Sequence, residues 1–440
     1  MWSLLSSLAF ALDTPQSLLT EGMAAQRAGD SATAIARYQA CIGLDPNFVG
    51  CHWEVGWSYW TRNDWAHVVE HWRKVQTLDP AHADLGKYLP TAVANLEGMQ
   101  AVQPAIASAP TTARPALPTG TTIRLRAVGD LMIGSDFPEP MLPPDDAAHY
   151  FDGISDWLRD ADVTFGNLEG PLCDSGTTNK CKPGQNCYAF RSPTRYAKLY
   201  KDAGFDVMST ANNHAEDFGV ECRVVTEDTL KSVGLAYSGR PGTIATLDVK
   251  GVRVAVIGFH TSTNSHWVND HDAAAALVKG LAASHDLVIV SFHGGAEGSK
   301  ATHVMHGHEM FYGEDRGDLP AFARVVIGAG ADLVLGHGPH VLRGMEVVDG
   351  HLVAYSLGNF GTYGRFNLSG PMGLTEVLEV TLDAEGKLVS GKILAAKQEG
   401  DGIPVKDSTG AAIATIRALS QEDFPETAPV IAQDGTFAPR

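Results

Sequence analysis

From Thr122 onward, short apolar runs alternate along the chain with longer stretches of helical spacing. The apolar runs are rich in Val, Ile and Leu, as buried strands are. They are residues 123–128, 162–165, 206–209, 252–257, 286–291, 333–335 and 351–356. Helices are predicted between them, for example over 195–203, 219–233 and 319–329. This alternation predicts a layered α/β domain, with one more strand at 375–381 and a short helix near 411–418.

The region from 15 to 82 has a different pattern, because it repeats. The residues that recur 34 positions apart are Gly22 and Gly56, Ala34 and Val68, Tyr38 and Trp72, and Pro46 and Pro80. This period resembles the tetratricopeptide repeat, a helical hairpin, and a third helix over 83–96 would cap the stack. Such arrays bind peptides or partner proteins, so the repeats are either a partner-binding module or a structural appendage.

A Pro/Ala/Thr-rich stretch, 99–121, predicts a solvated linker. The repeats then form a helical domain over 15–98, preceded by a signal-peptide remnant at 1–14. That remnant is apolar and ends in Ala9-Phe10-Ala11, which has the small-x-small pattern of a signal-peptidase site but no positive start. The alternative is the apolar start of a first helix.

The chain has six cysteines, an even count that fits disulfides in an oxidising compartment. Cys41 and Cys51 are near the facing ends of two predicted helices, where they would bond. Cys173, Cys181 and Cys187 share one polar loop, for which a zinc knuckle is the alternative, although CxxC is absent. We expect a periplasmic or secreted protein and leave the pairing open.

Charge and composition limit the partners. The 440 residues carry a formal charge of −18 and are 44% hydrophobic. A nucleic-acid partner would need a basic face, so none is expected. Apart from the N-terminus, no stretch approaches the roughly 20 apolar residues of a membrane span, so we do not expect an integral membrane protein.

Metal-binding types of side chain follow one predicted strand after another. They are Asp130, Asn167, Glu169, Asn213, His214, His293, His337 and His340. Each alone is explained as a turn, cap or structural residue. Together they would meet at one sheet edge, where buried carboxylates and imidazoles are costly without an ion. Oxygen and imidazole ligands without cysteine suit one or two divalent ions, Mn, Zn or Fe.

The order of these motifs resembles the calcineurin-like metallophosphoesterases. More closely, it is similar to the CapA (poly-γ-glutamate synthesis, capsule biosynthesis) family over about 122–405, which leaves 406–440 as a C-terminal extension. The motifs are Gly129-Asp-Leu-Met132, Asn167-Leu-Glu-Gly-Pro171, Ala211-Asn-Asn-His214, His293-Gly-Gly295, Gly336-His-Gly-Pro-His340 and Tyr355-Ser-Leu-Gly-Asn-Phe360. The resemblance implies a four-layer αββα sandwich after the all-α repeats, hence an α/β (α+β) protein.

The resemblance also implies roles for the strand-end residues. The implied metal ligands are Asp130, Glu169 as the bridging carboxylate with Asn167 beside it, Asn213, His293, His337 and His340. His214 would be catalytic, protonating the leaving group or steadying the transition state. Two departures stand out: Met132 replaces a histidine of the first motif, and the second motif reads Gly-Asn-Leu-Glu instead of Gly-Asp. The ion bound by His340 is therefore the one these departures affect.

Several other polar residues are weaker candidates. We expect Glu297 to cap a helix, Asn359 to hold a loop, and Arg316 and Arg343 to form structural salt bridges rather than clamp an anion. The cluster His303, His306 and His308 is interpreted as a helix start that lines the cleft, with an accessory metal site as the alternative.

Two hypotheses for function follow. The first is a metal-dependent hydrolase that uses metal-activated water on an anionic envelope polymer, poly-γ-glutamate or a small molecule, cleaving a phosphoester or an amide. The second is a non-catalytic accessory protein that binds metal or polymer and recruits a protein partner through its repeats. His214 favours the first hypothesis and Met132 the second.

Overall fold

The computed structural model describes residues 13–28, 30–62, 64–107, 120–178, 180–181 and 188–440, with the side chains of 98–107 excepted. It divides into two compact units, Met1–Glu97 and Gly98–Arg440. The predicted signal peptide falls almost wholly outside the described residues. Within the described part, every helix is too short or too polar to span a membrane.

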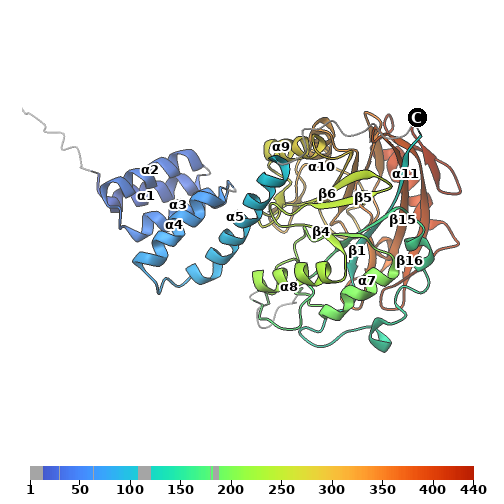
Figure 1. Cartoon of the computed structure of the whole chain (residues 1–440), viewed down its shortest axis with the longest axis horizontal. Coiled ribbons are helices and arrows are strands. Elements are labelled where there is room, and N and C mark those ends of the chain that lie inside the picture. The colour runs from blue at the N-terminus through green and yellow to red at the C-terminus, as the bar shows by residue number, and fades with distance from the viewer. Residues whose placement is uncertain (1–12, 29, 63, 108–119, 179, 182–187) are drawn as a thin grey trace, which may run out of the picture. The chain divides into compact units, whose positions relative to one another are not determined.

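The first unit consists of helical hairpins (Figure 1). Helices α1, Pro15–Arg27, and α2, Ser31–Leu44, form one, while α3, Val49–Trp60, and α4, Trp65–Leu78, form the other. Asp30 accepts a hydrogen bond from the Thr33 amide at the start of α2, and Asp64 does the same for His67 at the start of α4. These caps are 34 positions apart, like the residues of the repeat.

The recurring glycines and aromatic residues pack against each other inside each hairpin. A Cβ atom at Gly22 would overlap the ring of Tyr38, and one at Gly56 would overlap the ring of Trp72. Both rings are fully buried. The 34-residue period therefore reflects a close approach of two helices that needs glycine on one side and a large ring on the other.

The helix that follows the two hairpins is longer than predicted. Helix α5 covers Leu85–Ala107, so it continues into the stretch predicted as a linker. Ala, Leu, Met and Gln, which are good helix formers, dominate 91–103 and account for the extension. The expected bond between Cys41 and Cys51 is confirmed, and it joins α2 to α3. Residues 108–119 lie outside the described part of the chain.

The second unit contains two large sheets. The ten-stranded sheet has the order β18-β19-β16-β15-β1-β2-β3-β4, with β14 paired to β1 and β17 to β16. Its strands are β1 Thr122–Met132, β2 Val163–Leu168, β3 Val207–Ser209, β4 Ala236–Ser238, β14 Asn359–Thr362, β15 Leu374–Asp383, β16 Leu388–Glu399, β17 Ile403–Lys406, β18 Val430–Ile431 and β19 Thr436–Ala438. The last two strands show that the segment 406–440 contributes strands to this sheet.

The seven-stranded sheet has the order β12-β13-β11-β8-β6-β5, with β7 paired to β6. Its strands are β5 Ala245–Val249, β6 Val252–His260, β7 His266–Trp267, β8 Leu287–His293, β11 Leu333–His337, β12 Met345–Val348 and β13 His351–Ala354. A small hairpin, β9 Met310–Phe311 and β10 Glu314–Asp315, pairs separately. Strand β11 was expected to break at Gly336 but continues to His337, because both residues pair with β8.

Helices cover the outer faces of both sheets (Figure 1). They are α6 Ser155–Arg159, α7 Ala197–Ala203, α8 Gly219–Ser232, α9 His271–Ala282 and α10 Leu319–Gly328. Helix α11, Ala411–Asp423, instead packs on the central hydrophobic cluster through Ala412 and Ile416. Short 3₁₀ turns are at Pro144–Ala147, Thr194–Tyr196 and Gly370–Gly373. In Figure 1, α7 and α8 lie on one side of the strands and α9 and α10 on the other.

Three hydrophobic clusters separate four layers. The central cluster joins inward side chains of both sheets, such as Leu125 and Ile289. A second cluster packs the ten-stranded sheet against α6, α7 and α8, and a third packs the other sheet against α9 and α10. The predicted αββα sandwich, preceded by helical hairpins, is therefore confirmed.

The glycine–ring contact gives a test of the repeats. Gly56→Ala should destabilise the protein by about 1–3 kcal/mol, because the added methyl group overlaps buried Trp72. Gly43→Ala is the matched control: it is in α2, exposed, with nothing near its Cβ position, and should be neutral or slightly stabilising. Urea unfolding of the full chain followed by tryptophan fluorescence measures both. Equal midpoints would contradict the packing argument.

A buried carboxyl group in β15 predicts a pH effect. Burial alone raises the pKa of Glu376 to about 8, and its Oε2 has no hydrogen-bond partner. The unfolded chain loses this proton first, so stability should fall as pH rises from about 4.5 to 8. Glu376→Gln should remove that fall, gaining roughly 1.4 kcal/mol per pH unit over the wild type in this window. Denaturant melts at pH 5 and pH 8 test this, and a constant difference would refute it.

Candidate metal centre

Two rows of polar side chains meet where the sheets end side by side. In the ten-stranded sheet, Asp130 of β1 is in register with Asn167 of β2 and with Asn359 of β14. In the other sheet, His293 of β8 is in register with His260 of β6 and with His337 of β11. Because these strands are parallel, their carboxyl ends lie at one edge, which collects residues far apart in sequence.

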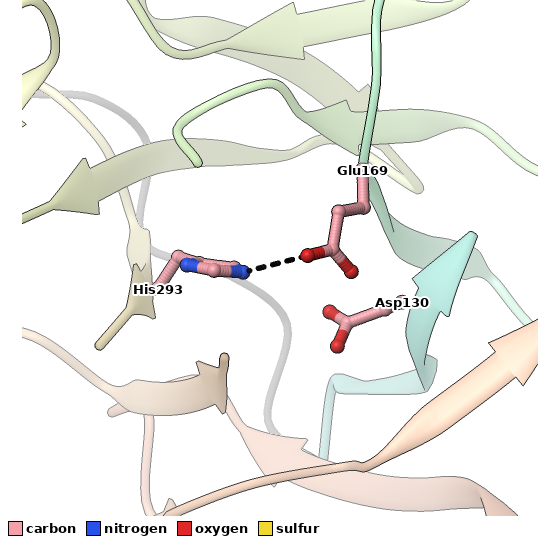
Figure 2. A group of neighbouring side chains, drawn as sticks. All are labelled: Asp130, Glu169 and His293. Carbon is pink, nitrogen blue, oxygen red and sulfur yellow. Dashed lines mark ion pairs between the residues drawn. The ribbon is translucent and has the colours of Figure 1, made fainter. Parts of the chain in front are cut away.

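Three of the predicted ligands converge there. Asp130, Glu169 and His293 each offer an atom within 4.8 Å of the others, and all three are buried. Figure 2 shows the two carboxylates and the imidazole turned toward one another, with His293 Nε2 3.4 Å from Glu169 Oε1. Within the described part of the chain, this is the single group of three or more His, Cys, Asp or Glu residues close enough to hold an ion.

The lack of hydrogen-bond partners for two of these residues fits a metal site. Both oxygens of Glu169 and both ring nitrogens of His293 are buried without a hydrogen-bond partner. Burial, and then the charge of Asp130, raise the pKa of Glu169 well above its ordinary range. Burial, and then His260, lower the pKa of His293. A divalent cation would supply the missing partners, and oxygen with imidazole ligands suits Mn, Zn or Fe.

Asp130 is held in place by neighbours on both of its oxygens. Asn167 Nδ2 donates to Oδ1 at 2.8 Å, and His340 Nδ1 lies 3.1 Å from Oδ2. Burial acts to raise the pKa of Asp130, but the hydrogen bond and charge of His340 outweigh it and the pKa is lowered. The hydrogen bonds to Asp130 therefore favour its charged form, whereas burial beside Asp130 disfavours the charged form of Glu169.

His340 reaches the cluster through an uncommon backbone conformation. Its φ of 60° is left-handed, which few residues other than glycine adopt. Nε2 then lies 3.7 Å from both Glu169 Oε1 and Glu297 Oε2. Burial acts to lower the pKa of His340, but Glu169 and Asp130 outweigh it and raise the pKa to about 10. His340 therefore lies beside two carboxylates whose negative charge favours its protonated form.

Two predicted ligands are placed differently. His337 does not offer a free nitrogen to the cluster, because Nε2 is 3.2 Å from the Val128 carbonyl oxygen and Nδ1 is 3.4 Å from Ser291 Oγ. Asn213 has a buried Oδ1 without a partner, as a ligand to a second ion would. Met132, which replaces the histidine of the first motif, is buried at the end of β1.

The predicted catalytic histidine belongs to a buried pair. His214 Nδ1 lies 2.8 Å from Asp217 Oδ2, and Nε2 faces Glu169 Oε1 at 4.0 Å. Lys180 Nζ donates to Asp217 Oδ1 at 2.6 Å. Burial lowers the pKa of His214, and Asp217 opposes this. A histidine oriented by a carboxylate can transfer a proton at Nε2.

An aromatic wall adjoins both histidines. The ring of Phe190 is 4.3 Å from that of His214, and the ring of Phe366 is 5.3 Å from that of His340, measured between centroids. The two phenylalanines contact each other at 5.1 Å. This wall restricts water on one side of the cluster.

Sequence reasoning missed several supporting residues. Asn212 donates to the Leu168 carbonyl oxygen at 2.8 Å and fixes the loop that carries His214. Asp217 and Lys180 were not identified either. The spacing of His214 and Asp217 in one loop was a usable signal, but Lys180 gave none, because it comes from the cysteine-rich segment. In that segment Cys173 bonds Cys222, which excludes it as a zinc ligand, and Cys187 is outside the described residues.

Three weaker expectations are corrected or refined. Glu297 does not cap a helix, since none begins there, and instead pairs with Arg316 at 2.9 Å. No helix starts at the histidine cluster either: His303 pairs with Asp423, and His308 with Asp315, so the two do not share a site.

The remaining arginine and Asn359 behave as expected. Arg343 donates to both oxygens of Glu309, at 2.7 and 2.8 Å, and is structural. Asn359 Nδ2 donates to the His340 and Met372 carbonyl oxygens at 3.3 Å, which holds the loop of His340.

Comparison with known proteins points to one family. The model of the family described as bacterial capsule synthesis protein PGA_cap matches residues 124–363. Capsule biosynthesis protein CapA of Bacillus anthracis is 28% identical over 249 residues, covering 54% of this chain and 59% of that protein. PGA biosynthesis protein CapA of Bacillus subtilis is 29% identical over 251 residues, covering 53% and 61%. The chain thus spans about three fifths of the length of these relatives.

A solved chain titled as an O-GlcNAc transferase of Thermobaculum terrenum also matches, covering 74% of this chain and 78% of that one. Its identity of 11% and TM-score of 0.22 are too low to inform on fold or function.

Metal binding by this cluster can be measured without any substrate. Adding Mn²⁺ or Zn²⁺ to metal-free protein should stabilise the folded state and so raise its melting temperature. At a hundredfold excess of free ion over Kd, the free energy of unfolding should increase by about 2.7 kcal/mol. Glu169→Gln keeps the shape but removes the charge, and should abolish the shift. Glu376→Gln is the matched control, because it makes the same substitution at a similarly buried carboxyl group in β15. This variant should show the same metal-induced rise in melting temperature as the wild type. Elemental analysis gives the stoichiometry. A shift that survives Glu169→Gln would place the ion elsewhere.

Proposed function

The chain belongs to the bacterial capsule synthesis protein family PGA_cap, and with it to the metallophosphoesterase-like superfamily, and from this premise we propose that it is a metal-dependent hydrolase. Its substrate would be a cell-envelope or poly-γ-glutamate-type molecule, cleaved at a phosphoester or amide bond. The observation that supports catalysis is the pair of His214 and Asp217 beside the buried Asp130, Glu169 and His293.

Asp130, Glu169 and His293 would hold a divalent ion, with His340 and Asn213 on the side of a second one. A bound ion would polarise the scissile group and lower the pKa of a water molecule. The resemblance also assigns His337 to the metal, although both its nitrogens have protein partners in this arrangement.

The residues themselves would orient and move a proton. Asp217 accepts from Nδ1 of His214, so Nε2, which faces the cluster, is the nitrogen that would exchange a proton with substrate. Lys180 neutralises the second oxygen of Asp217 and so keeps that carboxylate in place. Phe190 and Phe366 restrict water beside this histidine and His340, which strengthens electrostatic interactions at the cluster.

A second candidate is a non-catalytic accessory protein of capsule or polymer synthesis. Met132 supports it, since the first motif lacks an imidazole and one ion site would be weakened. In this case the α/β unit binds metal or polymer, and the helical hairpins recruit a protein partner.

A periplasmic or secreted location is proposed on chemical grounds. The disulfides Cys41–Cys51 and Cys173–Cys222 form and persist in oxidising compartments. An envelope substrate would be accessible there.

Hydrolysis assays separate the two candidates. Metal-loaded protein should hydrolyse either p-nitrophenyl phosphate esters or γ-glutamyl peptides, and His214→Gln should lower kcat about 10²–10⁴-fold, because it removes the ring nitrogen that exchanges the proton. His303→Gln is the matched control: this histidine pairs with Asp423 outside the cluster, so activity should persist. Folded, metal-loaded protein that is inert on both substrate classes would favour the accessory role.

A further inference from the structure

One buried arginine near the cluster has two nitrogens without a hydrogen-bond partner among the described residues. Arg316 is 1% exposed and precedes α10. Its backbone is fixed on both sides: its amide donates to the Glu309 carbonyl oxygen at 2.7 Å, and its carbonyl accepts from the Gly295 amide at 2.8 Å. The segment that follows His293 therefore holds Arg316 beside the metal-binding edge.

The guanidinium of Arg316 is only partly paired. Nη2 lies 2.9 Å from Glu297 Oε1, yet Nε and Nη2 make no hydrogen bond among the described residues. Nη1 is 3.6 Å from Glu314, which is exposed. Leaving charged donors buried and unsatisfied is costly, so a missing partner is expected.

Arg343 shows what a purely structural arginine looks like in the same region. Its Nε donates to the Ala301 carbonyl oxygen at 2.8 Å, and Nη1 and Nη2 donate to Glu309 at 2.7 and 2.8 Å. All three nitrogens are satisfied by the protein. The difference between two equally buried arginines is that Arg316 retains free donors.

Arg316 is linked to the cluster through Glu297 and through its own backbone. Glu297 Oε1 contacts Arg316, and Glu297 Oε2 is 3.7 Å from His340 Nε2. The carbonyl oxygen of Arg316 accepts from the amide of Gly295, two positions after His293. Arg316 therefore lies on the segment that adjoins the cluster.

We propose that Arg316 binds an anionic group of the substrate through Nε and Nη2. Until substrate arrives, the carboxylate of Glu297 occupies part of this anion site by contacting Nη2. These two donors are on the same edge of the planar guanidinium group, and their parallel N–H bonds match two oxygens of a phosphate or a carboxylate. Glu297 is 18% exposed and has a flexible stem, so it can move aside to admit the anion. This inference rests on the proposed function and defines its substrate as anionic.

Calorimetric titration of the metal-loaded full chain tests the proposal without turnover. The probes are inorganic phosphate, which mimics a phosphoester, and γ-glutamyl-glutamate, which carries the carboxylates of a glutamyl polymer. At least one probe should bind, and Arg316→Lys should weaken it tenfold or more, because lysine keeps the charge but loses the paired donors. Arg324→Lys, an exposed residue of α10 paired with Glu346, is the matched control and should bind like the wild type. The probe affected identifies the anion class.

The outcomes separate this inference from the proposed function. Arg316→Lys that is folded, metal-loaded and unchanged in affinity for both probes overturns it and makes Arg316 a structural partner of Glu297. The inference is overturned equally if neither probe binds the wild type. Arg316-dependent binding without any hydrolysis supports the anion site while refuting the enzyme.

A second variant covers the case in which Arg316→Lys does not fold. Glu297→Gln removes the competing carboxylate from the guanidinium, so affinity for the bound probe should rise about threefold or more. Unchanged or lower affinity would overturn the role of Glu297 as the residue that occupies the anion site.

Discussion

The second unit depends on the burial of two carboxylates, Asp130 and Glu169, between the ends of two sheets. Carboxylates so close together repel each other and lose their hydration, and the protein offsets this only in part. Asp130 receives hydrogen bonds from Asn167 and His340, whereas Glu169 receives none. The two buried carboxylates are therefore incompletely compensated by the protein, and a divalent cation bound between them would supply the missing positive charge.

Much of the surrounding structure serves to hold this point. His340 adopts a left-handed backbone so that its ring reaches Asp130, and Asn359 fixes that loop by hydrogen bonds to backbone oxygens. Asn212 does the same for the loop of His214. Positive charge is also distributed around the carboxylates, with Lys180 on one side and Arg316 on the other.

The fold was largely predictable because its determinants are local. Apolar runs and helical spacing indicated the order of elements, and the 34-residue period indicated the hairpins. Strand boundaries were less accurate: β1 continues to Met132, β11 to His337, and β16 to β19 were not predicted. These segments contain Gly, Lys or isolated polar residues, and their pairing depends on neighbours far along the chain, which a local pattern does not report.

For the site, the sequence by itself determined which chemical groups are present at the strand ends, since Asp130, Glu169, His214, His293 and His340 all follow apolar runs. Only the tertiary structure decided which atoms remain available. His337 and His293 are equivalent in the sequence pattern, yet His337 is satisfied by Val128 and Ser291, while the ring nitrogens of His293 have no hydrogen-bond partner among the described residues. Arg316 and Arg343 differ in the same way. The reason is that hydrogen-bond competition depends on groups brought close by folding, such as Asp130 and His340, which are 210 positions apart.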